Sequence, residues 1–247
     1  MTFVHKAFNR LWPDKELNAE VTIRYSGKFS DYNANVLYNS LRISFRLSKK
    51  WKGVDEDIII GLIQNLMIKV FKSKEYKNYN RQNKIELYEM FLKNVGKVAP
   101  RKESHPLLIE SFNRVNDSYF NGLMDMPNLI WGKHTLTKLG SYEYGNDTVL
   151  MSMVFKEAPQ ELLDYVMYHE LLHKKHKFYH KNGKSFHHTT AFRNDEKMFR
   201  SNGRNAGELE KDIKYFLRGK KIKRAFFGSK SQSKKKKTNP FFNFWKQ

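Results

Sequence analysis

Histidine, a common ligand of transition metals, is concentrated in one short stretch of this sequence. Six of the nine histidines lie between residues 169 and 188, and the stretch contains His169-Glu170-Leu171-Leu172-His173. Residues four apart lie on one face of an α-helix, so these two imidazoles could ligate a single Zn²⁺. We expect Glu170, beside the first histidine, to act as a general base that takes a proton from the attacking water and passes it to the leaving amine.

A catalytic zinc usually takes a third protein ligand and keeps one position open. A third histidine six residues after the motif is excluded, because Tyr179 stands there. Glu196, on a later predicted helix, is one candidate. His188 is another, because it precedes a predicted helix face that continues through Phe192, and packing of the phenylalanine would aim the imidazole inwards. His187 could replace His188 if that helix begins one residue away from the expected start.

The motif also has a plainer interpretation. The helix could be lysine-rich and solvated, with Glu170 paired to Lys174 four residues later. His176, which follows among lysines, is expected to be solvated in either case. The metal interpretation is favoured because the apolar Leu162 continues the histidine face backwards as a wall under the metal.

Alternating strand and helix patterns must position this site. Pro159 suits the first position of a helix, which we expect to continue to about Lys175 and to carry the motif. Other predicted elements are a helix over 107–119, an extended segment over 128–133, a hairpin over 138–155 turning at 145–147, a hairpin over 177–187, and helices over 189–200 and 206–217. The pattern predicts an α+β fold, with a small mixed sheet packed on helices that include the metal helix.

The first hundred residues predict a second block of strands (21–48) and helices (55–72 and 84–98). At an offset of 104 residues, Ala7-Phe8-Asn9-Arg10 corresponds to Ser111-Phe112-Asn113-Arg114, and Leu47-Ser48 to Met151-Ser152. We hypothesise an internal duplication, with two unrelated blocks as the alternative. Different strand connectivity in the two halves would refute it. The motif would correspond to Asn65, Leu66 and Lys69, which cannot bind zinc, so the first copy would be inactive.

Charge and composition limit the remaining possibilities. The net charge is +21, and residues 218–247 hold eleven Lys or Arg and no Asp or Glu. We expect this segment to be a disordered arm for polyanions such as nucleic acid.

The absence of cysteine excludes a disulfide scaffold and a thiolate nucleophile and suits the cytoplasm. No apolar run is long enough to span a membrane, and the start lacks a signal-peptide core. The expected domains are 1–100, an N-terminal α+β region; 101–217, which carries the metal motif; and the tail, 218–247.

Roughly residues 107–200 resemble the SprT-like (Spartan-type) zinc metalloproteases. The resemblance rests on Tyr168 to His173, followed after fourteen residues by a histidine with phenylalanine at +4. Upstream segments contribute, namely Leu129-Ile130-Trp131, Leu139-Gly140-Ser141-Tyr142, Val149-Leu150-Met151-Ser152, Ala158-Pro159 and Asp164-Tyr165-Val166. It implies His169, His173 and His188 as zinc ligands, Glu170 as the catalytic base, and a compact α+β protease fold. It also implies, as in several members, cleavage of proteins attached to DNA.

These observations predict a zinc-dependent endopeptidase that hydrolyses peptide bonds with metal-activated water and acts on DNA-associated proteins. Its expected partners are a protein substrate and, through the basic tail, nucleic acid, with no membrane. One alternative is a non-catalytic nucleic-acid-binding protein in which the histidines hold a structural zinc. Another keeps the zinc chemistry but directs it at a small-molecule amide.

Overall fold

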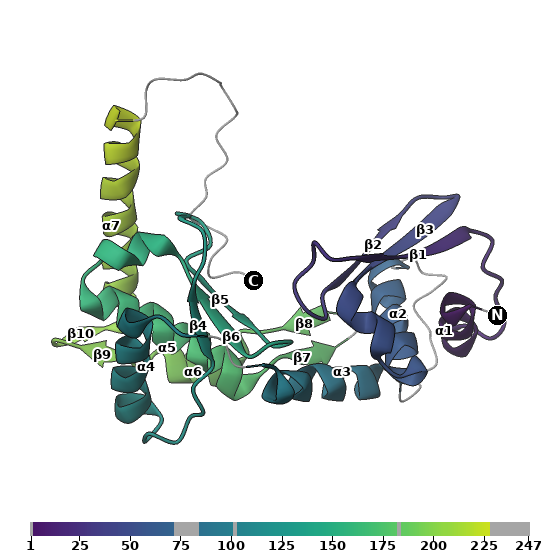
Figure 1. Ribbon diagram of the computed structural model, residues 1–247, viewed down its shortest axis with the longest axis horizontal. Helices are drawn as coiled ribbons and strands as arrows, with labels where there is room; N and C mark the ends of the chain where they lie inside the picture. Colours follow the sequence, from purple (N-terminus) through teal and green to yellow (C-terminus); the bar gives the residue numbers. More distant parts are fainter. Residues whose placement is uncertain (1, 72–83, 101–102, 182–183, 228–247) are drawn as a thin grey trace. The chain divides into compact units, whose positions relative to one another are not determined.

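The computed structural model describes residues 2–71, 84–100, 103–181 and 184–227 (Figure 1). The chain divides into two compact units: unit 1 is Met1–Ala99 with Tyr144–Asn146 and His180–Ser185, and unit 2 is the remainder. Both contain helices and a small sheet, which confirms the α+β class. None of the helices in the described part of the chain combines the length and apolar character that crossing a membrane requires.

Unit 1 packs helices against one side of a three-stranded sheet. Its elements are α1 (Phe3–Leu11), β1 (Glu20–Ser26), β2 (Ala34–Tyr38), β3 (Arg42–Ser48), η1 (Lys49–Gly53), α2 (Glu56–Val70), α3 (Lys84–Val95) and η3 (Gly96–Val98). The strand order is β1-β3-β2, with β1 parallel and β2 antiparallel to β3. α2 begins where Asp55 caps it, its carboxylate accepting a hydrogen bond from the Asp57 N–H. Phe8, Phe45 and Trp51 are fully buried between sheet and helices.

The second half of the chain contains α4 (Pro106–Tyr119), β4 (Asn128–Trp131), β5 (Gly140–Glu143), β6 (Thr148–Met151), η4 (Met153–Glu157), α5 (Gln160–His176), β7 (Tyr179–Lys181), β8 (Lys184–Phe186), α6 (Thr190–Glu196), β9 (Arg200–Ser201), β10 (Arg204–Asn205) and α7 (Ala206–Phe227). The main sheet has the order β4-β6-β5, with β4 parallel and β5 antiparallel to β6. β7 pairs with β8, as expected, while the turn at 182–183 lies outside the described residues.

The two halves repeat one arrangement. In each, a helix precedes three strands of the same order and orientation, followed by a short 3₁₀ helix and a long helix. A serine at the end of the third strand has a similar role in each half: Ser48 Oγ accepts the Tyr32 N–H and Ser152 Oγ accepts the Thr135 N–H, each at 3.1 Å. The strand connectivity is therefore the same in both halves, so it does not refute the duplication hypothesis, which stays a prediction.

The long helix of unit 1 carries no metal ligands at the positions that correspond to the motif. Asn65, the counterpart of His169, is buried and its side chain forms a hydrogen bond with Tyr88 of α3. α3 approaches α2 so closely that a Cβ on Gly61 would lie 2.9 Å from the Tyr88 Cβ. In unit 1, this part of the long helix is thus covered by another helix.

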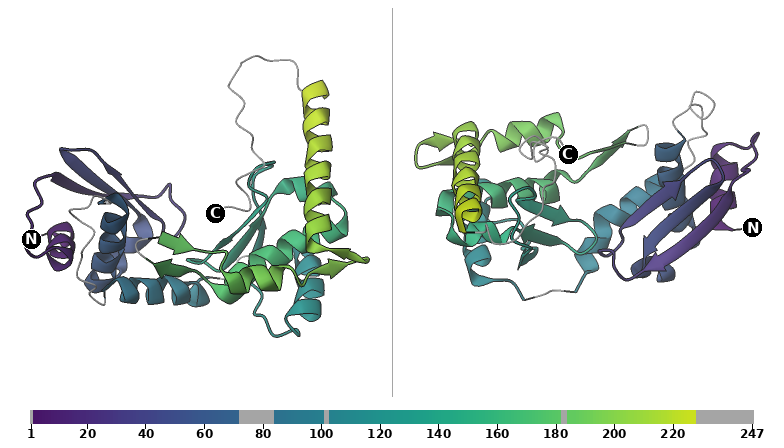
Figure 2. Two further views of the ribbon diagram at one scale, coloured as in Figure 1. Left: turned by 180° about the vertical axis from the view of Figure 1, so that it is seen from behind. Right: turned by 90° about the horizontal axis from the view of Figure 1, so that it is seen from above.

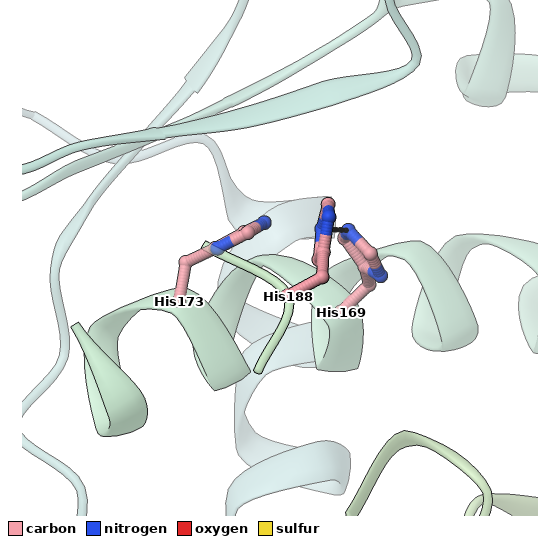
Figure 3. A group of neighbouring side chains, drawn as sticks. All are labelled: His169, His173 and His188. Atoms are coloured by element: carbon pink, nitrogen blue, oxygen red, sulfur yellow. Dashed lines mark hydrogen bonds between the residues drawn. The ribbon is translucent and has the colours of Figure 1, made fainter. Parts of the chain in front are cut away.

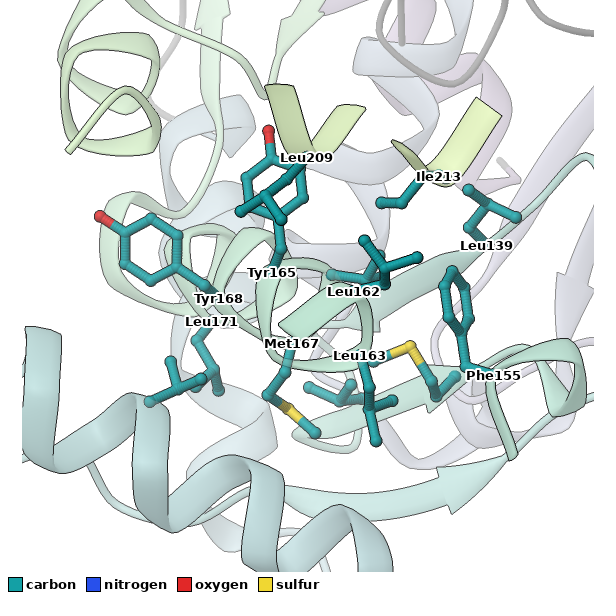
Figure 4. Packing of buried hydrophobic residues seen from close by; sticks show 14 of the residues in the cluster. Leu139, Phe155, Leu162, Leu163, Tyr165, Met167, Tyr168, Leu171, Leu209 and Ile213 are labelled. Carbon is teal, nitrogen blue, oxygen red and sulfur yellow. The ribbon is translucent and has the colours of Figure 1, made fainter. Parts of the chain in front are cut away.

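α5 runs through the centre of unit 2 (Figure 4). Its residues from Leu162 to Leu172 are buried on every side, against the sheet, α4, α6 and α7. Leu163 and Met167 contribute to the same core as Phe155 and Leu209. The helix is therefore held along most of its length, and side chains projecting from it are fixed by the core.

A buried ion pair joins α5 to α4. Asp164, 8% exposed, accepts hydrogen bonds from Arg114 Nε at 2.9 Å and Nη2 at 2.8 Å. Ser111 Oγ donates a third bond to the same carboxylate at 2.6 Å. A carboxylate removed from water needs such partners, so the bidentate arginine and the serine together fix the α4–α5 packing.

Three element boundaries differ from the sequence predictions by four residues or more. The strand expected to continue to residue 155 ends at Met151, because Ser152 caps η4 by accepting the Val154 N–H. The helix expected over 189–200 ends at Glu196, after which Phe199 is buried in the core.

The helix expected to end at 217 continues through Phe227 (Figure 2, left), so the predicted disorder from residue 218 is wrong as far as 227. Buried Leu209, Ile213 and Leu217 anchor this helix, and the lysines and arginines that follow favour its continuation. Residues 228–247 lie outside the described part.

Candidate metal centre

Three of the predicted ligands meet in unit 2 (Figure 3). His169, His173 and His188 each offer one ring nitrogen, and these nitrogens all lie within 4.8 Å of one another. His169 and His173 come from successive turns of α5, as the four-residue spacing required. His188 comes from the loop before α6, whose N-cap is formed by Thr189 Oγ1 accepting the Phe192 N–H at 3.2 Å.

One phenylalanine supports all three imidazoles. The Phe192 ring, fully buried in α6, lies 5.2 Å from the ring centroid of His169 and 4.8 Å from those of His173 and His188. The sequence predicted that packing of this phenylalanine would direct His188 inwards, and the ring contacts show that packing. Apolar support of this kind limits the rotation of imidazoles and holds their nitrogens toward a common point.

Neither alternative third ligand belongs to the group. Glu196 lies behind His169, with its Oε1 2.6 Å from His169 Nδ1. The other ring nitrogen of His169, Nε2, therefore faces the histidine cluster, where it lies 3.3 Å from His188 Nε2. A carboxylate on the distal nitrogen of a ligating histidine fixes its tautomer and orientation. The His187 ring packs 6.0 Å from that of Phe178 and 6.1 Å from that of His173.

The protonation of the cluster suits a metal. Burial, followed by the repulsion of neighbouring histidines, lowers the pKa of His173 to about 2, so its imidazole is neutral near pH 7. Neutral imidazole is the metal-binding form. Among the described residues, the buried His173 Nδ1 has no hydrogen-bond partner. Three imidazoles form a donor set that suits zinc, as well as copper, iron or nickel.

Glu170 is enclosed between α5 and β5. It is 2% exposed, and burial raises its pKa to about 7 against the opposing effects of His169 and of a hydrogen bond from the Tyr142 N–H. A Cβ on Gly140 would lie 2.9 Å from both the Cγ and the Cδ of Glu170, so this close approach requires glycine. A carboxyl whose pKa lies near neutrality can both accept and donate a proton at physiological pH.

The plainer, solvated interpretation of the motif is wrong. His169 and Glu170 are both 2% exposed. Lys174 is not paired with Glu170, because its Nζ bonds both carboxylate oxygens of Asp147 at 2.7 and 2.8 Å. His176 is not solvated either: its Nε2 lies 2.8 Å from Asp195 Oδ2 and its side chain is 16% exposed.

Sequence reasoning did not foresee the supporting contacts. Asp195 and Glu196 act as a pair at the end of α6, one near His176 and the other near His169. Tyr168 strengthens this junction by donating its hydroxyl proton to the Asp195 carbonyl at 2.7 Å. These partners are separated by about 20 residues or more, and no local pattern signals them. Gly140 belongs to the segment Leu139-Gly140-Ser141-Tyr142 that the sequence analysis singled out. Its contact with Glu170, however, arises only because the strand that contains it packs against α5.

Comparison with known proteins gives limited information. No protein-family model matches the chain, and no curated protein matches it. Among solved structures, the chain is similar to the metallopeptidase zymogen jannalysin of Methanocaldococcus jannaschii, with 23% identity and a TM-score of 0.34. The similarity covers 48% of this chain and 96% of that chain. The metal-binding interpretation rests on the side-chain geometry and not on this likeness.

Proposed function

We propose that this protein is a zinc-dependent endopeptidase of the SprT-like kind. The observation that carries the proposal is the meeting of three histidine nitrogens beside a buried glutamate whose pKa is about 7. His169, His173 and His188 would hold the ion. Zinc bound by three protein ligands acts as a Lewis acid and lowers the pKa of a water molecule to about 7.

The chain's own residues then handle the proton. Glu170 takes a proton from the attacking water and later passes it to the leaving amine. Gly140 and the Tyr142 N–H hold the Glu170 carboxyl in place, and burial supplies its raised pKa. Glu196 keeps His169 in the tautomer that presents Nε2. The Phe192 ring packs against all three imidazoles and holds them together.

The sheet beside Glu170 favours a peptide substrate over a small amide. Among the strands that the structure describes, β5 pairs with β6 alone, so it lies at the edge of its sheet. An extended peptide can add to such an edge through main-chain hydrogen bonds. Because Glu170 bonds the backbone of Tyr142 in this strand, a peptide aligned along β5 would pass next to the carboxyl.

Nucleic acid is part of the same proposal. The far end of α7 carries Arg218, Lys220 and Lys221, and basic residues continue through the rest of the tail. A basic arm of this kind attracts phosphates without reading sequence. We therefore extend the proposed substrates to proteins associated with DNA.

Zinc analysis and a peptidase assay test the proposal together. Elemental analysis should give one zinc per chain in the wild type, greatly reduced in His188→Ala and unchanged in the matched control His187→Ala. Glu170→Gln should keep its zinc yet lose casein hydrolysis by at least about 100-fold. Zinc without any hydrolysis in the wild type would instead support a structural zinc, and full zinc in His188→Ala would refute the ligand set.

A further inference from the structure

One face of the unit 1 sheet is open. In Figure 1, α1 and α2 lie below β1, β2 and β3, and no described helix of unit 1 covers their upper side. Burial alternates along β3: Ile43, Phe45 and Leu47 are buried against the helices, while Arg42 and Arg46 are exposed. Side chains alternate between the faces of a strand, so the exposed residues belong to the open face.

Two arginines lie side by side on this face. Arg24 of β1 and Arg46 of β3 are register partners, and both are exposed. Asn35 of β2, opposite Arg46, extends the row across the whole sheet. In the next row, Thr22 Oγ1 donates to Ser44 Oγ at 3.0 Å. Like charges directly opposite one another destabilise a sheet. The arginine pair therefore lowers the stability of the fold, so a structural role does not explain its presence.

No carboxylate neutralises the pair. Within the part of the chain that the structure describes, neither Arg24 nor Arg46 has an acidic partner. The glutamate on the same sheet, Glu20, is paired with Arg42 instead, at 2.6 Å. Residues 21–52 contain seven Lys or Arg and one acidic residue, Asp31. The face therefore presents two unneutralised guanidinium groups in a strongly basic surrounding.

The repeat in unit 2 shows that this fold does not demand the arginines. At the offset of 104 residues, Arg46 corresponds to Leu150 of β6. The register partners of Leu150 are Ile130 and Ser141, so the same row in unit 2 has no charge at all. The arginine row is thus particular to the unit that lacks the histidine set.

We infer that the open face of the β1–β3–β2 sheet binds the phosphate backbone of a nucleic acid. Arg24 and Arg46 would each contact a phosphate, for which the guanidinium fork is well matched. The polar groups of Thr22, Ser44 and Asn35 can bond phosphate and sugar oxygens beside them. Leu37 is the one large apolar side chain that strand alternation places on this face, too little for insertion into a membrane. The site is separate from the zinc chemistry proposed above.

The test measures binding of the full-length protein to a labelled 20-nucleotide single-stranded DNA by fluorescence anisotropy at several salt concentrations. Arg24→Gln/Arg46→Gln removes two charges from the face. Lys133→Gln/Lys211→Gln removes two exposed charges from unit 2 and is the matched control. Each phosphate contact contributes about 0.7 to the slope of log affinity against log salt, so losing two should flatten the slope by about 1.4.

The wild type and the lysine control should share the steeper slope, and Arg24→Lys/Arg46→Lys should retain it. Asn35→Asp, which offers Arg46 a carboxylate across the strands, should weaken binding without lowering the melting temperature. Equal slopes for the arginine-to-glutamine variant and the lysine control would overturn the inference. Unchanged DNA binding combined with lost binding to phosphatidylserine vesicles would also overturn it, in favour of a lipid surface.

Discussion

Replacing Glu170 by glutamine should stabilise the metal-free protein, and most strongly at alkaline pH. Burial raises the pKa of this carboxyl from its ordinary value of 4.5 to about 7. The folded protein therefore holds this proton more tightly than the unfolded chain, and the carboxyl destabilises the fold progressively as pH rises from about 4.5 to 7. The cost is about 1 kcal/mol at pH 5 and about 3 kcal/mol at pH 8.

Glutamine has nearly the same shape as glutamate and no charge to bury. Urea unfolding in the presence of EDTA should therefore show Glu170→Gln gaining about 2 kcal/mol more over the wild type at pH 8 than at pH 5. Glu103→Gln, which removes an exposed carboxylate, is the control and should show no comparable difference. A gain at Glu170 that is equal at the two pH values, or a loss at pH 8, would refute the assignment of a desolvated carboxyl.

Three further substitutions test the support of the site. Gly140→Ala places a Cβ 2.9 Å from the Cγ and Cδ of Glu170, so under the proposed function the peptidase kcat should fall about tenfold or more with zinc content unchanged. Gly132→Ala is the control and should be tolerated, because the nearest neighbour of its Cβ would be 3.6 Å away. Phe192→Ala removes the buried ring that packs against the histidines and should lower the free energy of unfolding in EDTA by about 3–5 kcal/mol. The same substitution should weaken zinc binding, measured by competition with a chelator. Arg114→Ala leaves Asp164 buried without its bidentate partner and should cost about 3 kcal/mol in urea unfolding, while loss below about 1 kcal/mol would mean that water replaces the arginine.

Local patterns predicted most of the fold, because the strongest signals in this chain are local. The long helix starts after Pro159, as its sequence indicated, and the strands of the two three-stranded sheets lie in the segments predicted to be extended. The spacing of His169 and His173 requires only a helix to bring them together. The meeting with His188 depends on how α6 packs, and the buried Phe192 was the residue that indicated it.

Features governed by contacts between distant segments could not be predicted in this way. Glu196 was considered as a ligand, but α6 places its carboxylate against His169 Nδ1 instead. The helical extension to Phe227 depends on the anchoring of α7 by the core of unit 2. The proximity of Gly140 to Glu170 joins residues 30 positions apart through the sheet. The roles of the three histidines and Glu170 stay predictions until metal and activity are measured.

The repeated arrangement of strands also bears on how this chain avoids misfolding. Tandem units with the same strand order can exchange strands while they fold, which is a common failure of repeated domains. Here β3 has seven residues and β6 has four, so a swapped strand would not match its new neighbours in length. A swap would also put the Arg46 guanidinium beside Ile130. The length difference between β3 and β6, together with the charge of Arg46, therefore disfavours an exchange of these two central strands.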